Sequence, residues 1–568
     1  MTFLANEMIL SLGDFTTAVE STFKKWKEEN LLKRIWEKDP SIWIQGAGLA
    51  DSIAELSNRL GWLDAVEKTK STVKELSDFS NNLRTREIND VILLGMGGSS
   101  LAPEVIMDVF GKRDGWPVLT VLDTTDPETI LSLMPMIDPD KTLFIVSSKS
   151  GGTIETLSLF KYFYSYYRAI GLEAGYHFVA ITDPGSGLER LANEKRFLKV
   201  FSSPPDVGGR YSALTVFGMV PSALIGVDIE KLIRKTDSMM ELCGPDIEAE
   251  KNPAAVLGAF MGEMALKGRD KLSLVISLSI SRLGAWIEQL VAESLGKNGK
   301  GILPIVDEGS LEIEDYGDDR AFVYIKLDGD DNTDLESSYQ VVSSKGIPSL
   351  KVTIGDTYDL GGLFFIWELA TALSASIIGV NPFDQPDVES AKLKSRALME
   401  EYRKTGNIRT DKPLFVQDEV EFFGSDAIHG KTIKIGLESF LNGKNETDYV
   451  AIMAYLPYDE ELNDCLEDIR TGIRKKTGLA VTLGYGPRFL HSTGQLHKGG
   501  NNNGLFIQIT HRISEDAGIP GEAYSFGALI TAQAVGDYEA LIDAGRRVCR
   551  LNIKGDIGEN LEEILKAL

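Results

Sequence analysis

The sequence predicts an α/β protein with two doubly wound parallel-sheet domains and a further α/β unit at the C-terminus. The main observation is a series of short apolar runs that alternate with amphipathic helical stretches from residue 91 onward. Such runs are typical of parallel strands that helices bury on both faces. The second observation is the length of 568 residues, because a chain of this size divides into several hydrophobic cores.

Changes in this pattern predict the domain boundaries. Residues 1–85 have apolar positions at helical spacing and should form helices that pack on the core. The runs VILLG, VLTVLD, TLFIVSS, HFVAITD and FLKVF predict a first sheet domain over residues 86–245. LSLVIS, GILPIVDE, AFVYIKLD and SLKVTIGD predict a second over 246–400, and DYVAIMAYLP, GLAVTLGYGP and GLFIQIT predict the C-terminal unit over 401–568.

Composition and charge exclude several classes of protein. Apolar residues make up 43% and charged residues 25%, as in ordinary folded proteins. A net charge of −25 repels nucleic acid and anionic membrane surfaces. A small anionic ligand remains compatible with this charge, because backbone N–H groups and a few basic side chains can make a pocket locally positive.

The expected location is the cytoplasm. The three cysteines, Cys243, Cys465 and Cys549, are widely spaced and indicate neither a disulfide framework nor a thiolate metal site. The first residues, MTFLANEMILSLGDF, lack the basic start of a signal peptide. Residues 361–380 are nearly long enough to cross a membrane, but Glu368 near their centre favours a buried core helix.

Glycines and hydroxyl side chains follow two of the predicted strands. In VILLGMGGSSLAPEV, Gly98 and Ser99 lie between a strand and a helix, where they form either a tight turn or an anion site. In SSKSGGTIET, polar side chains open the next helix, where they either cap it or surround a phosphate: Ser148, Lys149, Ser150 and Thr153. We favour the phosphate, because both strands end at the same edge of one sheet.

These and three later segments resemble a known family. SKSGGTIET is similar to the phosphate loop of sugar-isomerase domains. DVGGRYSALTVFGMVPSALIG (206–226), EQLVAESLGKNGKGI (288–302) and NPFDQPDVESAK (381–392) resemble segments of phosphoglucose isomerases. The resemblance implies flavodoxin-like αβα sugar-isomerase domains and, as in glycolysis and gluconeogenesis, isomerisation of D-glucose 6-phosphate to D-fructose 6-phosphate through a cis-enediol. It implies no cofactor and no metal, and it suggests a homodimer.

The chemistry explains why these residue types occur. Aldose–ketose isomerisation moves a proton between neighbouring carbons, which one carboxylate can do. The resemblance gives this role to Glu293 and the stabilisation of the enediolate to Arg210. It implies that Gln289 and Gln385 contact the sugar and that Lys392 assists ring opening. Ser99, Ser148, Ser150 and Thr153 would then bind the phosphate, with Gly98 and Lys149 beside them.

The ring-opening histidine departs from the family pattern. The family places it between the glutamate segment and the NPFDQ segment, but no histidine lies between residues 298 and 380. GQLHKG (494–499) resembles the family's QLxHQG segment, displaced into the C-terminal unit. This order is similar to the isomerase half of transaldolase–phosphoglucose isomerase fusions. We therefore expect His497 to open the ring, with His491 as the alternative.

Two other functions remain open at this level. One is a dual-specificity phosphoglucose/phosphomannose isomerase. The other is a non-catalytic regulator that binds sugar phosphates, since the same domain type serves as a binding module. Such a regulator should lack both the glutamate of AESLGK and Arg210, whereas this chain has both.

Overall fold

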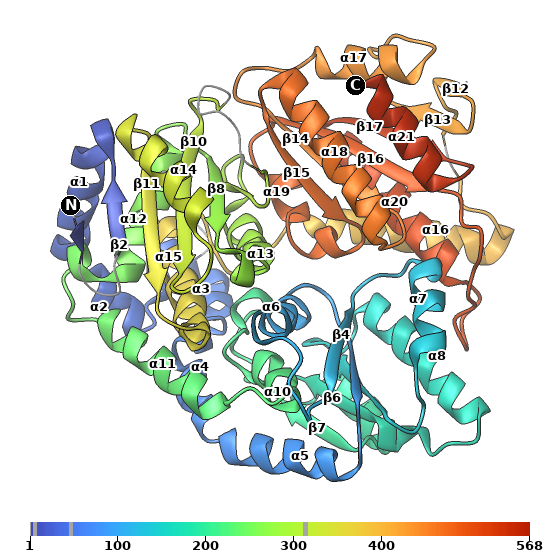
Figure 1. The fold of residues 1–568 in the computed structure, drawn as a ribbon, viewed down its shortest axis with the longest axis horizontal. Coiled ribbons are helices and arrows are strands. Elements are labelled where there is room, and N and C mark those ends of the chain that lie inside the picture. Colours follow the sequence, from blue (N-terminus) through green and yellow to red (C-terminus); the bar gives the residue numbers. More distant parts are fainter. Residues whose placement is uncertain (1, 4–7, 45–48, 310–315, 410) are drawn as a thin grey trace.

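The computed structural model describes residues 2–3, 8–44, 49–309, 316–409 and 411–568, and it confirms the α/β prediction (Figure 1). Among these residues the longer strands form three sheets, one in each predicted unit. The first domain has a fully parallel sheet in the order β4-β3-β5-β6-β7. Its strands are β3 (Asp90–Leu94), β4 (Val118–Leu122), β5 (Thr142–Ser147), β6 (Phe178–Thr182) and β7 (Lys199–Ser202).

Four helices connect these strands: α6 (Leu101–Phe110), α7 (Pro127–Leu133), α8 (Ile154–Ala169) and α9 (Gly187–Glu194). α10 (Val216–Leu224) and α11 (Ile229–Leu242) follow the last strand, and α11 packs on the second domain. The start of α7 shows how the sequence sets a boundary. Asp126 accepts a hydrogen bond from the backbone N–H of Thr129 at 2.9 Å, and Pro127 occupies the first helical position.

The second domain combines its own parallel strands with the start of the chain. The sheet order is β1-β2-β11-β10-β8-β9. Its strands are β8 (Lys271–Ile276), β9 (Leu303–Ile305), β10 (Arg320–Leu327) and β11 (Ser349–Ile354), with β1 (Thr2–Phe3) and β2 (Met8–Ser11) at the edge. β2 pairs antiparallel with β11, so the prediction of helix throughout residues 1–85 is wrong for Met8–Ser11. The rest of that segment forms α1 (Thr16–Glu28), α2 (Leu31–Trp36), α3 (Leu49–Ser57), α4 (Ala65–Lys70) and α5 (Val73–Thr85).

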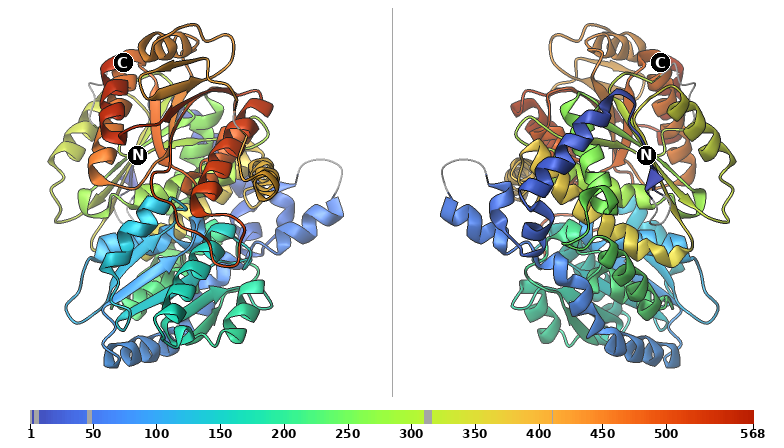
Figure 2. Two further views of the ribbon diagram at one scale, coloured as in Figure 1. Left: turned by 90° about the vertical axis from the view of Figure 1, so that its right-hand side faces the viewer. Right: turned by 90° about the vertical axis from the view of Figure 1, so that its left-hand side faces the viewer.

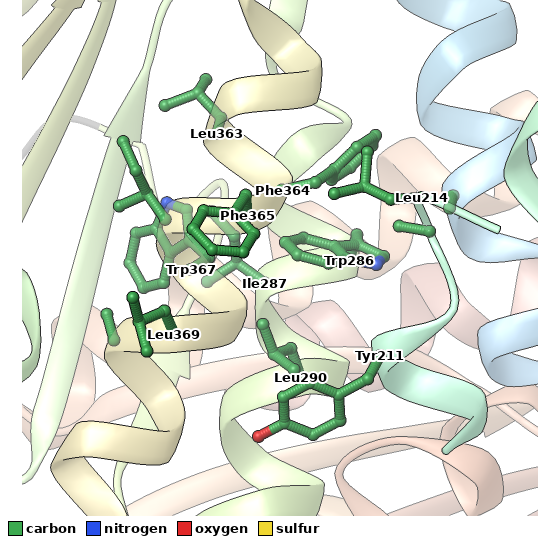
Figure 3. Packing of buried hydrophobic residues seen from close by; sticks show 14 of the residues in the cluster. Tyr211, Leu214, Trp286, Ile287, Leu290, Leu363, Phe364, Phe365, Trp367 and Leu369 are labelled. Carbon is green, nitrogen blue, oxygen red and sulfur yellow. The ribbon is translucent and has the colours of Figure 1, made fainter. Parts of the chain in front are cut away.

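The long apolar helix lies in the middle of this domain. α15 (Leu360–Ile378) is the helix that is apolar enough to cross a membrane in the described part of the chain, and 89% of its most apolar window is buried inside the protein. It packs against α12 (Pro253–Leu266) and α13 (Leu283–Leu295), while α14 (Thr333–Ser344) lies against β10 and β11. Figure 3 shows Trp286, Ile287 and Leu290 of α13 beside the aromatic side chains of α15. The position of α13 is therefore fixed by core packing.

The C-terminal unit repeats the same winding. Its sheet order is β12-β13-β17-β16-β14-β15, from β12 (Phe415–Gln417), β13 (Val420–Phe423), β14 (Tyr449–Tyr455), β15 (Ala480–Tyr485), β16 (Gly504–His511) and β17 (Arg547–Ile553). In all three described sheets, the first parallel strand of the unit lies between the second and the third, and the fourth follows the third. This is the start of the flavodoxin-like order.

The helices of the C-terminal unit hold it against the other two domains. They are α16 (Val388–Thr405), α17 (Ile433–Leu441), α18 (Glu460–Thr477), α19 (Gly494–Gly499), α20 (Phe526–Asp543) and α21 (Ile557–Ala567). α16 packs along α20, so this helix runs across the predicted boundary at residue 400. Apolar residues of α16 and α20 share a core with the first domain, and the unit lies above that domain in Figure 2. A separate apolar cluster joins the unit to β9 and α13.

Candidate active site

Helix α13 presents two of the predicted site residues to one region. Gln289 and Glu293 are one turn apart, and Gln289 Nε2 donates a hydrogen bond to Glu293 Oε2 at 3.2 Å. The helix is buried on its other side, as described above, so it holds the carboxylate on a rigid element. The Glu293 side chain is 14% exposed, which leaves it within reach of a small ligand.

Arg210 connects this carboxylate to the NPFDQ segment. Its side chain is only 4% exposed and begins in the 3-10 helix Gly209–Tyr211. Nη1 donates to Glu293 Oε1 and to Gln385 Oε1, each at 3.0 Å. Nε donates to the Ser294 hydroxyl at 2.8 Å. Nη2 donates to the backbone carbonyl oxygens of Pro382 at 2.6 Å and Asp384 at 2.9 Å. A guanidinium held in this way is a preorganised positive charge beside the carboxylate.

Lys297 anchors the same segment from the other side. Its buried ammonium donates to the carbonyl oxygens of Asn381 at 2.8 Å and Asp384 at 2.5 Å, and to Asp384 Oδ1 at 2.8 Å. Burial lowers the pKa of Lys297 to about 8. Sequence reasoning singled out only Glu293 in AESLGK and missed Lys297, although it belongs to the same motif.

The glycine loop packs between two site segments. A Cβ atom on Gly98 would lie 2.1 Å from the carbonyl oxygen of Gly209, next to Arg210. Gly97 has a φ of +55°, and a Cβ there would meet Gln289 Nε2 at 2.8 Å. These glycines are therefore required by close approach of the protein itself, in addition to any ligand. Ser99 follows them as a buried residue.

The hydroxyl-rich loop adjoins the glycine loop. Ser147 Oγ donates to the carbonyl oxygen of Ser99 at 3.0 Å, which ties the two loops together. Ser148 Oγ lies 3.0 Å from Thr153 Oγ1, and Ser150 is exposed with its Oγ accepting from the Gly152 backbone N–H at 3.3 Å. These hydroxyls can turn toward an oxyanion.

Lys149 does not join the hydroxyls. Its Nζ forms an ion pair with Asp183 at 2.6 Å and lies near two backbone carbonyls. Burial lowers the pKa of Lys149, although Asp183 opposes this effect. We predicted that Lys149 lies beside a phosphate. In this structure its ammonium instead forms the ion pair with Asp183, which fixes the loop.

Of the two histidines proposed for ring opening, the structure brings His491 to the site. His491 lies at the end of the 3-10 helix Arg488–His491, and its backbone oxygen accepts from Gln289 Nε2 at 2.7 Å. Its Nε2 is 3.2 Å from Glu155 Oε1 at the start of α8. Burial raises the pKa of Glu155, but the contact with His491 and the nearby charge of Lys392 outweigh it and hold this pKa below its usual value. Glu155 is thus an ionised partner for the imidazole.

The structure does not bring His497 to this group. His497 is 3% exposed and lies among three aromatic rings, with centroids at 5.0 Å (Phe506), 6.1 Å (Phe489) and 6.3 Å (Tyr449). Neither ring nitrogen has a hydrogen-bond partner among the described residues. Burial lowers the pKa of His497 well below its ordinary value, so the ring is neutral. The reason is the short helix α19, which turns this side chain into the core of the C-terminal unit.

The C-terminal unit also supports the site through a glutamine that sequence reasoning missed. Gln533 of α20 donates to Glu155 Oε1 at 2.7 Å and accepts from Thr125 Oγ1 at 2.7 Å. Glu155 itself was within the SKSGGTIET motif and could have been found there. No local pattern marked Gln533, because its partners lie several hundred residues away along the chain.

The chain is similar to known proteins over the segments that carry most of these residues. The family Phosphoglucose isomerase matches residues 61–315, which include the two loops, Arg210, Gln289 and Glu293. A probable glucose-6-phosphate isomerase of Methanococcus maripaludis is 32% identical over 377 residues, covering 60% of this chain and 84% of that protein. A glucose-6-phosphate isomerase of Rubrobacter xylanophilus is 29% identical over 385 residues, covering 58% and 87%.

Solved structures share the fold over two thirds of the chain. A hypothetical protein from Thermus thermophilus superposes with a TM-score of 0.58 at 24% identity, covering 68% of this chain and 99% of that one. A glucose-6-phosphate isomerase from Chlamydia trachomatis has a TM-score of 0.55 at 18% identity, with coverage of 67% and 86%. By the length and identity of the sequence matches, this chain belongs to the phosphoglucose isomerase family.

Proposed function

We propose that this protein interconverts D-glucose 6-phosphate and D-fructose 6-phosphate. The observation that carries the proposal is the position of Glu293 between Gln289 and Arg210. Its carboxylate is buried enough to be fixed yet open to a small ligand, and a fixed guanidinium stands 3.0 Å away. A base paired with a positive charge is what enolisation next to a carbonyl requires.

The neighbouring loops supply a place for the phosphate. The hydroxyls of Ser148, Ser150 and Thr153 lie at the carboxyl end of β5, and Glu155 of the following helix contacts His491. Gln289 then links His491 to Glu293. The loop and the base are therefore connected through one short chain of contacts.

The reaction proceeds in two stages. First, the sugar ring opens as a proton reaches the ring oxygen and another leaves the anomeric hydroxyl. We assign the proton donor to His491 in place of His497, because only His491 has an acidic partner and lies beside Gln289. Lys392 is close enough to lower the pKa of Glu155 and assists at this end of the site.

In the second stage, Glu293 takes the proton from C2 of the open-chain aldose. The electrons form a cis-enediolate, whose negative oxygen Arg210 stabilises. A proton then passes from the O2 hydroxyl to O1, the protonated Glu293 delivers its proton to C1, and C2 becomes the carbonyl carbon of the ketose. This regenerates the carboxylate, and because each step is a proton transfer that can run in either direction, the reaction is reversible.

The test is the steady-state conversion of fructose 6-phosphate by Glu293→Gln, with Glu288→Gln as the matched control. Both residues lie on α13, but Glu288 lines a different cavity together with Arg470 and Arg488. We expect kcat to fall by about 10³-fold or more for Glu293→Gln, with little change in KM, and to stay within about three-fold for Glu288→Gln. Retention of a tenth or more of the wild-type kcat by Glu293→Gln would exclude Glu293 as the base.

The histidine assignment has its own test. His491→Ala should slow the natural substrate about 10²-fold, and much less an analogue that lacks the 4- and 5-hydroxyls and cannot cyclise. Equal losses on both substrates would show that His491 does not act in ring opening.

We further propose that this activity belongs to glycolysis and gluconeogenesis and that the protein works in the cytoplasm; the names of the relatives support the reaction itself. If the protein forms a homodimer, each copy carries its own set of the residues described above. Fractionation of cells and sedimentation of the purified protein test these two points.

A further inference from the structure

A cavity in the C-terminal unit lies apart from the site described above. Its volume is about 390 Å³, within the size range of small-molecule pockets. Residues at the carboxyl ends of β14, β16 and β17 line it, together with the first turns of α20 and the end of α16. In doubly wound sheets this end of the strands is where ligands bind.

The most informative residue in this cavity is Arg550. It is 3% exposed, and its guanidinium lies 4.2 Å from the ring centroid of Phe423 and 4.8 Å from that of Tyr538. Within the described ranges it forms no ion pair and no side-chain hydrogen bond, and its Nε is buried without a partner. The other buried arginines of the described chain each have a carboxylate within 4.0 Å: Arg210, Arg320, Arg470 and Arg474.

A buried charge without a direct ion pair is costly and needs an explanation. Asp411, Glu421 and Glu539 are near enough to favour the charged form of Arg550, but none lies within 4.0 Å of it. The Glu421 carboxylate binds Lys554 at 2.5 Å and Asn552 Nδ2 at 2.9 Å. The two aromatic rings hold the guanidinium in place without neutralising it. A bound anion would supply the missing acceptor.

Two further buried groups line the same cavity without a partner. The hydroxyl of Tyr455, which is 2% exposed, makes no hydrogen bond, and neither does Nδ1 of His511. Arg512 and Lys554 stand at the exposed part of the lining. The lining also contains the carboxylates of Glu421 and Asp516, and Asp516 Oδ1 accepts from the backbone N–H groups of Ala517 and Gly527. The basic side chains outnumber these carboxylates, which favours a ligand with several acceptor oxygens.

We propose that this cavity binds a small phosphate-bearing anion and that its occupancy is coupled to the isomerase site. Arg550 and the hydroxyl of Tyr455 hold the phosphate oxygens, and His511 contacts it through Nδ1. The binding half of the proposal stands on the cavity alone, whereas the coupling half rests on the proposed function.

The coupling follows two contacts that lead out of the cavity. Residues of α20 line it, and Gln533 on the same helix donates to Glu155, the partner of His491. On the other side, His511 Nε2 lies 3.1 Å from Asp126 Oδ2, and Asp126 caps α7 of the first domain. An anion held by Arg550 and His511 beside the first turns of α20 stabilises the contact between the C-terminal unit and the first domain, and so holds Glu155 in place for His491.

Binding is tested by titration calorimetry of the full-length protein with inorganic phosphate. The Ser148→Ala/Thr153→Ala double variant serves as background, because it weakens the phosphate loop and leaves the cavity intact. In this background we expect one remaining phosphate site, with affinity about ten-fold or more weaker after Arg550→Gln and several-fold weaker after Tyr455→Phe. Arg512→Gln, at the exposed part, should change it by less than about three-fold. An unchanged Kd in both Arg550→Gln and Tyr455→Phe would overturn the site.

The ligand class and the coupling need separate arms. Acetate in place of phosphate tests the class, and binding of acetate as tight as that of phosphate would reject the phosphate specificity. For coupling, kcat is measured at saturating sugar phosphate, where competition at the phosphate loop is removed. We expect added phosphate to raise kcat of the wild type and to leave that of Arg550→Gln unchanged. Equal responses of the two proteins would refute the coupling. Absence of any turnover in the wild type would refute the proposed function, but the calorimetric result on phosphate binding would still stand.

Arg550→Gln also provides a check on folding. Since it removes a buried charge that lacks a partner, the unliganded variant should be at least as stable as the wild type in urea. A marked loss of stability would show that Arg550 has a structural role in place of the proposed one.

Discussion

The residues of the site belong to one chain, and this makes a strong prediction about mixed oligomers. Arg210 comes from the first domain, Glu293 from the second and His491 from the C-terminal unit. Gln289 bridges the last two, with 3.2 Å to Glu293 Oε2 and 2.7 Å to the His491 carbonyl oxygen. A site completed within each copy cannot be repaired by a second copy that carries the complementary defect.

The test pairs Glu293→Gln with His491→Ala. Each change alone should lower turnover about 10²- to 10⁴-fold. If the two copies of the proposed homodimer shared their sites, each mixed dimer would have one intact site of two. Mixed dimers separated from the other species would then have about half of the wild-type activity. The single-chain site predicts no recovery above about 1%, the level of the single variants.

The two variants are co-expressed with different affinity tags and purified through both. Coupled assay of fructose 6-phosphate conversion then measures turnover. The control is the wild type co-expressed with the Glu293→Gln/His491→Ala double variant, which should give about half of the wild-type activity per dimer. Recovery near a half in the test pair would mean that His491 acts on a neighbouring copy, and the reasoning from the single chain would fail.

Three further predictions follow from contacts in and behind the site. Arg210→Lys keeps the charge but loses the guanidinium that donates to both Glu293 and Gln385, so kcat should fall about 10²-fold in steady-state assays. An unchanged kcat would show that these paired hydrogen bonds are dispensable. Gly98→Ala places a Cβ 2.1 Å from the Gly209 carbonyl oxygen and should reduce kcat/KM at least about ten-fold. The control Gly209→Ala, whose Cβ would have no atom within 4 Å, should be tolerated. Similar effects of the two changes would argue against steric displacement. Burial raises the pKa of Glu368 well above its usual value, so the folded state loses stability as pH rises above about 4.3, by up to about 1.4 kcal/mol per pH unit until the raised pKa is reached. Urea unfolding should therefore show that the advantage of Glu368→Gln over the wild type grows from pH 4 to pH 8, and parallel pH profiles would contradict this.

Much of the fold could be predicted because the central strands are marked by local apolar runs. The runs from VILLG to GLFIQIT correspond to β3–β11 and β14–β16 in order. Five of the described strands have no predicted run: β1, β2, β12, β13 and β17. Two of them show the physical reasons. β2 (Met8–Ser11) is short and is stabilised by pairing with β11, more than three hundred residues away. β17 (Arg547–Ile553) carries Arg547, Arg550 and Asn552, which hide its apolar alternation.

The site could be predicted where the reactive residues belong to a recognisable motif. It could not be predicted where the local backbone decides which way a side chain points. The motifs around Arg210, Glu293 and Gln385 lie together in the structure. His491 and His497 could not be told apart, because both stand in the same glycine-rich segment, LHSTGQLHKGG. Only the turn from the 3-10 helix Arg488–His491 into α19 decides which imidazole faces Glu155 and which enters the core. Gln533 is recognisable only from the assembled protein.

The late position of His491 in the chain has a consequence for how the enzyme is made. During synthesis the first two domains leave the ribosome with the hydroxyl-rich loop, Arg210 and Glu293 already present. The imidazole and the glutamine that supports Glu155 follow only with the last part of the chain. A polypeptide that ends before the third sheet therefore lacks both His491 and Gln533, and the complete set of site residues exists only once that sheet is built.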